Sequence, residues 1–313
     1  MNFFYGIENN YLNVTNIVFS NCINNNIINI PGGDYERSLI FGDPLIGILK
    51  NIKINDHSNS ITKYFFDGEN IKIDLNQVFL QNNKIAYNNF INNTLSEPEP
   101  LVKLNYLQSL LKIENCSFKE EFPEQLMAMT FINKSDKVLE IGGNLGRNAI
   151  IISNILENDQ NLVTLECCDI LIPKLERNKF INNLFFHIEN SALSKDKLFF
   201  DPVMFSCNKS VQNSEKCMEV KTITFDDLQK KYNIQFDVLV ADCEGSLPQI
   251  LIDFPDLLTN INIIIMENDY LNIENKNILD NILIKNNFIR IYFEGGGWGV
   301  CQSNFFEVWK KKI

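Results

Sequence analysis

From Lys137 onward, short apolar segments alternate with segments of helical spacing, and this alternation constrains the fold more than any other feature. The expected strands are Val138–Ile141, Leu162–Glu166, Leu184–Ile188, Phe236–Asp242 and Ile261–Glu267. The expected helices between the first three strands are Asn148–Leu156 and Pro173–Asn182. Apolar strands that alternate with helices are typical of a parallel sheet that helices cover on both faces.

The C-terminal end of the chain departs from this alternation. Phe288–Glu294 and Phe305–Trp309 flank the loop Gly295–Gly297, and no helical pattern separates them. Strands joined by a short loop are expected to pair antiparallel. The sequence therefore predicts an α/β fold with a mostly parallel, seven-stranded sheet whose last strand is antiparallel.

The N-terminal region has a different pattern. Its segments are short and strand-like; Tyr11–Phe19 alternates in part, and Ile61–Phe66 and Ile71–Leu75 flank the turn Asp67–Asn70, which predicts a hairpin. The prolines within Ser96–Pro100 disfavour regular structure and indicate a boundary. We predict a small, mainly β accessory module over residues 1–95 and a second domain over 96–313, with a helical lead-in over 101–135.

Charge and hydropathy exclude several classes of partner. The net charge of −11 over 313 residues disfavours a nucleic-acid reader, which usually presents a basic face. The longest apolar run, Ile261–Met266, is too short to span a bilayer, and the N-terminus lacks the pattern of a signal peptide. We therefore expect neither nucleic acid nor a membrane as a partner.

The cysteines and the amino-acid bias of the chain indicate where in the cell the protein is expected. Eight cysteines form no C-x-x-C pair, which favours reduced thiols and a cytoplasmic location. The excess of Asn, Ile and Lys indicates an A/T-rich genome, such as that of a large DNA virus or a protist. A viral source would make a viral factory or the virion the expected place.

The first motif with chemical content is Glu140-x-Gly142-Gly143-x-x-Gly146, at the end of the first predicted strand. It differs from the G-x-G-x-x-G fingerprint of dinucleotide sites. An acid at the strand end suits a cationic or amine-bearing ligand such as S-adenosylmethionine. A tight connection from strand to helix explains the glycines equally well at this point.

Two further motifs follow the next strands. Glu166 ends the second strand, where an acid in nucleotide-binding sheets accepts hydrogen bonds from ribose. Ser191 and Ala192 follow the third strand, in position to contact an adenine ring. A solvated carboxylate and a polar turn are the alternative interpretations.

A group of acids ends the fourth and fifth strands. Asp242 and Glu244 precede Gly245, and Glu267 ends the fifth strand. Like charges at one sheet edge repel, so stability gives little reason for them and a role in binding or proton transfer is favoured. Asp242, Glu244 and Glu267 could instead bind Mg²⁺, but we assign no metal ligands from the sequence. His187 lies within a strand run, where a packed or edge histidine is expected.

Taken together, these segments resemble the FkbM-type S-adenosylmethionine-dependent methyltransferases. The matching segments are Val138–Gly146, Leu165–Glu166, Ser191–Leu193, Thr222–Leu228 and Asp237–Gly245. The family usually has Asp at the position of Glu140, Lys at Val240 or Ala241, and an acid at Leu247 or Pro248. The resemblance covers the chain from about Glu124 to its end.

The resemblance implies a Rossmann-like methyltransferase fold with S-adenosylmethionine as cofactor. Residues that would surround the methionine part are Glu140, Gly142, Gly143, Asn144 and Gly146. Glu166 would hold the ribose, and Ser191 and Ala192 would flank the adenine. Asp242 and Glu244 would face the methyl group and the acceptor, with Asp242 as the first choice of general base and Glu244 as the second.

The family acts mostly on hydroxyls of sugars or polyketides, so we expect an O-methyltransferase with a sugar or glycan acceptor. The N-terminal module would recruit that acceptor or mediate oligomerisation. Two alternatives stay open: a non-catalytic binding or scaffold protein that keeps the fold, and an NAD(P)-dependent sugar enzyme, which the form of the glycine motif disfavours.

Overall fold

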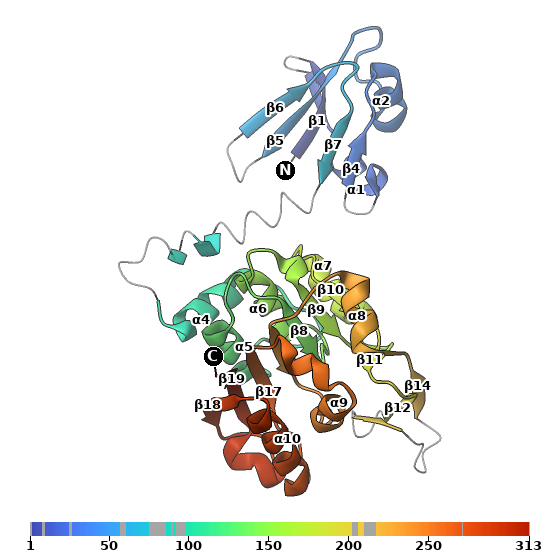
Figure 1. Ribbon diagram of the computed structural model, residues 1–313. Coiled ribbons are helices and arrows are strands. Elements are labelled where there is room, and N and C mark those ends of the chain that lie inside the picture. The colour runs from blue at the N-terminus through green and yellow to red at the C-terminus, as the bar shows by residue number, and fades with distance from the viewer. Residues whose placement is uncertain are drawn as a thin grey trace. The chain divides into compact units, whose positions relative to one another are not determined.

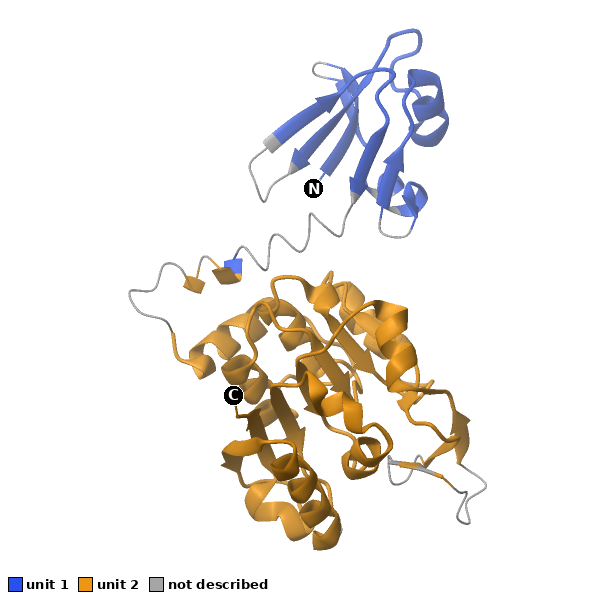
Figure 2. Ribbon diagram, in the orientation of Figure 1, with its two compact units in different colours: residues 1–86 blue, residues 87–313 orange. Residues whose placement is uncertain are grey.

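The computed structural model divides the chain into two compact units, residues 1–86 and 87–313 (Figure 2). It describes residues 2–7, 10–24, 27–56, 61–74, 86–88, 90–91, 98–201, 206–209, 217–270 and 272–312. The predicted boundary between residues 95 and 96 lies outside the described residues. Each unit is therefore considered by itself.

The described elements of the first unit are mainly strands, with the short helices α1 and α2 among them. Its elements are β1 (Asn2–Ile7), β2 (Asn10–Asn13), α1 (Thr15–Asn21), β3 (Ile23–Asn24), β4 (Ile27–Ile30), α2 (Asp34–Phe41), β5 (Asn51–Asp56), β6 (Ile61–Phe65) and β7 (Ile71–Asp74). A four-stranded antiparallel sheet has the order β2-β1-β5-β6, and a three-stranded one has the order β3-β4-β7. Phe3, Tyr5, Ile28 and Ile52 are central to its apolar core.

Two local predictions for this unit are wrong. The segment Tyr11–Phe19 is not one strand, because α1 begins at Thr15 and buries Val18 in the core. The strands on either side of Asp67–Asn70 form no hairpin: β6 pairs with β5, and β7 pairs with β4. Sequence spacing predicts a turn correctly, but the pairing partners of its flanking strands depend on the tertiary core.

Arg37 connects the turn Asp67–Asn70 to the end of β4. Its buried guanidinium donates to the carbonyls of Pro31 (2.9 Å), Phe66 (3.1 Å) and Glu69 (2.6 Å). Lys50 is also buried, and its Nζ lies 3.0 Å from Asp34 Oδ2 and 2.8 Å from Asp43 Oδ1. Arg37 and Lys50 thus both have their partners within the first unit.

The second unit contains a seven-stranded sheet with helices packed around it (Figure 1). Its helices are α4 (Pro100–Leu110), α5 (Phe122–Phe131), α6 (Arg147–Ile155), α7 (Ile172–Ile181), α8 (Phe225–Tyr232), α9 (Leu247–Asp253) and α10 (Ile273–Lys285), with short 3-10 turns η1 (Asp159–Asn161), η2 (Pro255–Thr259) and η3 (Gly299–Asn304). The strands of the main sheet are β8 (Val138–Ile141), β9 (Leu162–Leu165), β10 (His187–Glu189), β16 (Val238–Ala241), β17 (Ile263–Glu267), β18 (Phe288–Glu294) and β19 (Phe306–Lys311).

The strand order β10-β9-β8-β16-β17-β19-β18 confirms the predicted fold class. Strands β8, β9, β10, β16 and β17 are mutually parallel, and β19 runs antiparallel to both β17 and β18. From β8 the chain adds β9 and then β10 on one side of the sheet, and it later returns to add β16 and then β17 on the other side. The direction of the strand order therefore reverses between β8 and β16. Ligands of open α/β sheets bind at such a reversal point, outside the carboxyl ends of the strands.

Smaller sheets lie beside the main one. They are formed by β11 (Ala192–Leu193) with β15 (Thr222–Ile223), and by β12 (Leu198–Asp201) with β13 (Ser206–Asn208) and β14 (Met218–Val220). The third main strand begins at His187 rather than at the predicted Leu184. Leu184 and Phe186 are buried in the connection that precedes it. The eight cysteines all lie among the described residues as free thiols.

None of the described helices is both long and apolar enough to cross a bilayer.

Candidate functional site

The glycine loop and the end of β16 meet at the reversal point. The amides of Gly142 and Gly143 donate to Leu165 O (3.0 and 2.9 Å), and the amide of Asp242 donates to Ile141 O (3.0 Å). Gly142 has φ of 95°, and a Cβ there would lie 1.6 Å from Asp242 O. Only glycine fits this position, so the motif brings the loop after β8 against the loop after β16.

A cavity of about 500 Å³ opens at this edge of the sheet. A volume of this size suits a cofactor-sized ligand together with part of a second molecule. The cavity brings together most of the residues predicted from the sequence, namely Gly142, Asn144, Glu166, Ser191, Ala192, Asp242 and Glu244. We call it the large cavity.

Glu166 ties two loops of the large cavity together. Its Oε2 accepts from the amide of Asn144 (2.8 Å), and its Oε1 accepts from the amide of Cys168 (2.7 Å). Burial raises the pKa of the Glu166 carboxyl, and these backbone donors oppose that rise. Because a carboxylate has about four acceptor positions, Glu166 can still accept hydrogen bonds from a ligand hydroxyl in the cavity.

Ser191 is held by a second buried acid. Glu189 accepts from Lys231 Nζ (2.6 Å), from Tyr232 Oη (2.7 Å) and from Ser191 Oγ (3.2 Å). Lys231 and Tyr232 lower the pKa of Glu189 against the effect of burial. Glu189 is therefore a satisfied structural acid that fixes the wall of the large cavity at Ser191 and Ala192.

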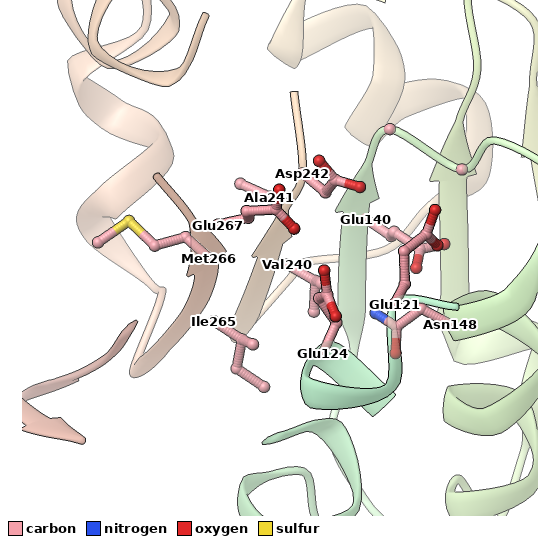
Figure 3. Close-up of a pocket in the computed structure, with 12 residues that line it drawn as sticks. Glu121, Glu124, Glu140, Asn148, Val240, Ala241, Asp242, Ile265, Met266 and Glu267 are labelled. Atoms are coloured by element: carbon pink, nitrogen blue, oxygen red, sulfur yellow. The ribbon is translucent and has the colours of Figure 1, made fainter. Parts of the chain in front are cut away.

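A second, much smaller cavity of about 10 Å³ lies next to the large one. This volume holds about one water-sized particle. Carboxylates from four segments line it (Figure 3): Glu121 and Glu124 at the start of α5, Glu140 of β8, Asp242 after β16 and Glu267 of β17. None of its described lining residues carries a positive charge. We call it the acidic cavity.

Burial and the repulsion of neighbouring charges raise the pKa of several carboxyls at the two cavities. Burial raises the pKa of Glu140 to about 8, and the charges of Glu121 and Glu166 add to the rise. Burial also raises the pKa of Asp242 well above its usual range, with Glu121 and Glu124 as the leading charges. The pKa of Glu244, which lines only the large cavity, rises to about 7 through burial and the charge of Asp269.

The backbone at the site is strained at two glutamates. Among the described non-glycine residues with positive φ, all are asparagine except Glu121 (φ 51°) and Glu244 (φ 50°). Asparagine tolerates this region, whereas glutamate adopts it at a cost of about 1–3 kcal/mol when the surrounding structure enforces it. Both glutamates lie at the cavities, which is where such strain is usually found.

One residue expected to surround the cofactor lies outside both cavities. Gly146 precedes α6 with φ of 86° and closes the loop by donating its amide to Gly143 O (2.8 Å). His187, which we expected to be a packed or edge histidine, lies on the edge strand β10 with its ring 4.7 Å from that of Tyr232.

Sequence reasoning missed Glu121 and Glu124. They precede the first strand, and only the packing of α5 against α6 and β17 brings them to the sheet edge. Their one local signal is an acid at the start of a helix, which favourable interaction with the helix dipole explains without any site. Arg147 buries its guanidinium against Glu120 (2.6 Å) and Glu121, so Glu121 has a cationic partner.

No protein-family model matches the chain, and no curated protein does. Among solved structures, the chain is similar to an O-methyltransferase from Bacillus cereus in complex with SAH (14% identity, 74% of this chain and 100% of that one, TM-score 0.40). It is also similar to a ribosomal protein L11 methylase from Lactobacillus delbrueckii subsp. bulgaricus (16%, 61% and 77%, TM-score 0.38). A third similar structure is precorrin-6y C5,15-methyltransferase from Geobacter metallireducens (11%, 65% and 96%, TM-score 0.40).

Proposed function

We propose that the protein is an S-adenosylmethionine-dependent O-methyltransferase that acts on a hydroxyl of a sugar or glycan. The observation that carries the proposal is Oε2 of Glu140, which is buried and accepts no hydrogen bond from the described residues. A buried carboxylate oxygen without a donor is costly unless a ligand supplies one. The residues of the site therefore call for a cationic donor beside the glycine loop.

The cofactor fits this requirement. Its ammonium group is about the size of a water molecule and would occupy the acidic cavity beside Glu140, next to Gly142, which borders both cavities. Its ribose would lie in the large cavity at Glu166, and its adenine would lie against Ser191 and Ala192. The two acids thus recognise opposite ends of one ligand.

S-adenosylmethionine, when bound, supplies an electrophilic methyl group on a sulfonium. The chain must align an acceptor oxygen with that group and remove its proton. Glu244 lines the large cavity, and its pKa of about 7 suits proton transfer near neutral pH. Asp242 lies deeper and borders both cavities, so we assign the base to Glu244 and give Asp242 a role in holding cofactor and acceptor.

The sugar class of acceptor is supported by the resemblance of Thr222–Leu228 and Asp237–Gly245 to the FkbM-type segments. A hydroxyl of a sugar has a high pKa, so its methylation requires a nearby base. Glu244 provides one in a cavity with room beyond the cofactor.

Calorimetry with the full chain tests the cofactor. We expect S-adenosylhomocysteine to bind and NAD not to bind. Glu166→Gln should weaken S-adenosylhomocysteine at least about tenfold, because an amide cannot accept from two backbone donors and a ribose at once. Glu176→Gln, an exposed acid on α7, is the matched control and should leave binding unchanged. Absence of S-adenosylhomocysteine binding by the unmodified protein would refute the proposal.

Methyl transfer tests the base and the acceptor. Incubation of glycans with the protein and methyl-labelled cofactor, followed by mass spectrometry, should show label on a sugar oxygen. Glu244→Gln should lower turnover by about 10²–10⁴-fold with cofactor binding retained. Unchanged turnover in that variant would contradict the assignment of the base, and label only on other acceptors would contradict the sugar class.

A further inference from the structure

Two cysteines from distant parts of the chain meet in the wall of the large cavity. Cys167 lies in the loop that follows β9, and Cys207 lies on β13, 40 residues further along the chain. Their Sγ atoms are 3.4 Å apart, and both residues line the large cavity. We call these two residues the thiol pair.

Hydrogen-bonded backbone holds each member of the thiol pair in place. Cys207 is paired with Phe200 in the antiparallel ladder of β12 and β13. Cys167 stands between Glu166 and Cys168, and the amide of Cys168 donates to Oε1 of Glu166 (2.7 Å). The contact between the two sulfurs therefore joins two fixed segments of the cavity wall, the β12–β13 ladder and the loop after β9.

The distance between the two sulfurs is close to what a covalent bond requires. The length of a disulfide bond is about 2.0 Å, so the Sγ atoms have to approach each other by roughly 1.4 Å. This movement is shared between two side chains that already touch. Formation of a bond between Cys167 and Cys207 thus needs no rearrangement of the fold.

The environment of the thiol pair favours reaction with a small reagent. Both cysteines are half-buried, and the large cavity, with a volume of about 500 Å³, gives a reagent access to them. The hydrogen bond from Cys167 lowers the pKa of the Cys207 thiol, although burial and the charge of Glu166 raise it. The thiolate is the form of cysteine that oxidants attack, so Cys207 is the member expected to react first.

Packing alone does not explain this placement. A free cysteine that serves a fold behaves as a small apolar side chain, as Cys22 does in the apolar core of the first unit. Cys168 and Cys301 are buried as well. The thiol pair instead faces a cavity, where a thiol is a weak hydrogen-bond donor and contributes little to stability.

We propose that Cys167 and Cys207 are a redox modification site, at which hydrogen peroxide or another hydroperoxide forms a reversible disulfide bond across the wall of the large cavity. The Cys207 thiolate attacks a peroxide oxygen, the O–O bond breaks, and Cys207 becomes a sulfenic acid. The sulfur of Cys167 then attacks Sγ of Cys207, the S–O bond breaks, and the S–S bond forms. In total the two sulfurs lose two electrons and two protons, and one hydrogen peroxide becomes two water molecules.

The effect on the cofactor rests on the proposed function, whereas the thiol pair itself does not. The bond would draw the loop after β9 and strand β13 together and narrow the cavity between them. Cys167 directly follows Glu166, which would hold the ribose. We expect the disulfide form to bind the cofactor about tenfold more weakly, because a displaced Glu166 loses a charged hydrogen bond to the ribose.

Mass spectrometry tests the bond without cofactor or acceptor. The full chain is reduced, freed of reductant, treated with hydrogen peroxide in molar excess, alkylated and digested. We expect a peptide that links Cys167 to Cys207, and we expect dithiothreitol to abolish it. Cys167→Ser and Cys207→Ser should each lack the linked peptide. Cys116→Ser, which changes a half-buried cysteine outside both cavities, is the matched control and should form the link as the unmodified protein does.

The unmodified protein alone is enough to overturn the site. Peroxide that oxidises Cys207 to the sulfinic acid without any link to Cys167, or that links either cysteine only to another partner, would refute it. Calorimetry with S-adenosylhomocysteine on the reduced and the oxidised protein then tests the coupling. Equal affinity of the two forms would refute the effect on the cofactor.

The same two measurements separate this inference from the proposed function. A linked peptide in a protein that binds no S-adenosylhomocysteine in either form would refute the cofactor and leave the redox site standing. Binding of S-adenosylhomocysteine without a linked peptide would refute the redox site alone. Peroxide treatment of Cys207→Ser should not weaken S-adenosylhomocysteine, which shows that the bond, and not oxidation elsewhere, causes the effect.

Discussion

The two units bury charge in opposite ways. In the first unit, Arg37 and Lys50 are 0% and 2% exposed, and hydrogen bonds and ion pairs within the unit satisfy both. At the carboxyl edge of the sheet in the second unit, Glu124 and Glu140 are 6% and 3% exposed, yet Oε2 of each accepts no hydrogen bond from the part of the chain that the structure describes. Buried charge that serves a fold is paired, so unpaired buried charge indicates a ligand.

The difference in how buried charges are paired is not a difference between whole units, because the second unit also contains paired buried acids. Glu307 and Glu189 are buried acids of that same unit, and each accepts from two or more donors that the chain supplies. The missing donors are therefore a property of the acidic cavity and its surroundings. Three predictions test this comparison.

The largest effect on stability is expected in the first unit, where the buried charges are paired. Arg37→Leu leaves the carbonyls of Pro31, Phe66 and Glu69 without their charged donor in a buried setting. We expect the first unit to lose about 3–5 kcal/mol of unfolding free energy. Hydrogen exchange of its amides under increasing denaturant measures this. Lys63→Leu removes an exposed cation of the same unit and should change it by less than about 0.5 kcal/mol; equal effects would break the comparison.

The next effect concerns pH. The pKa of Glu140 rises from 4.5 to about 8 on folding, with Glu121 and Glu166 facing it, so the folded state keeps a proton that the unfolded chain releases. Stability of the ligand-free second unit should therefore fall between about pH 4.5 and 8, by at most about 1.4 kcal/mol per pH unit for this group.

Tryptophan fluorescence follows this transition, because Trp298 and Trp309 both lie in the second unit. Glu140→Gln should flatten the slope. The first unit should respond with the opposite sign: Lys50 lowers the pKa of Asp43, a contribution that is lost as the pH falls. Equal slopes in Glu140→Gln and the unmodified protein would contradict the first expectation.

The smallest effect separates folding from binding at one residue. Glu140→Gln removes a buried carboxyl whose Oε2 accepts no hydrogen bond from the described residues, so thermal stability at pH 8 should stay equal or rise. The same change should weaken S-adenosylhomocysteine about tenfold, or about 1.4 kcal/mol, because a neutral amide attracts an ammonium group less. Calorimetry beside thermal unfolding gives both values. A destabilised variant with unchanged binding would assign Glu140 to the fold instead.

Local pattern predicts the second unit well because its strands are buried on both faces. Val138–Ile141 is apolar except for Glu140, and Val238–Ala241 is apolar throughout. Both strands end in loops that carry polar residues, so their existence and their carboxyl ends follow from the sequence. The first unit was less predictable, because α1 and the separate partners of β6 and β7 depend on contacts between distant segments. Short segments of this kind carry too few residues for periodicity to separate helix from strand.

The sequence alone determined the α/β class, the antiparallel last strand and the position of Glu140, Glu166, Asp242 and Glu244 at strand ends. Parallel strands carry their ends to one edge, so residues that follow them meet there whatever the details of packing. Only the tertiary structure decided that Glu121 and Glu124 join them from α5, and that the acids divide into satisfied and unsatisfied ones. Hydrogen-bond partners distant in sequence settle that division, and no local pattern encodes them.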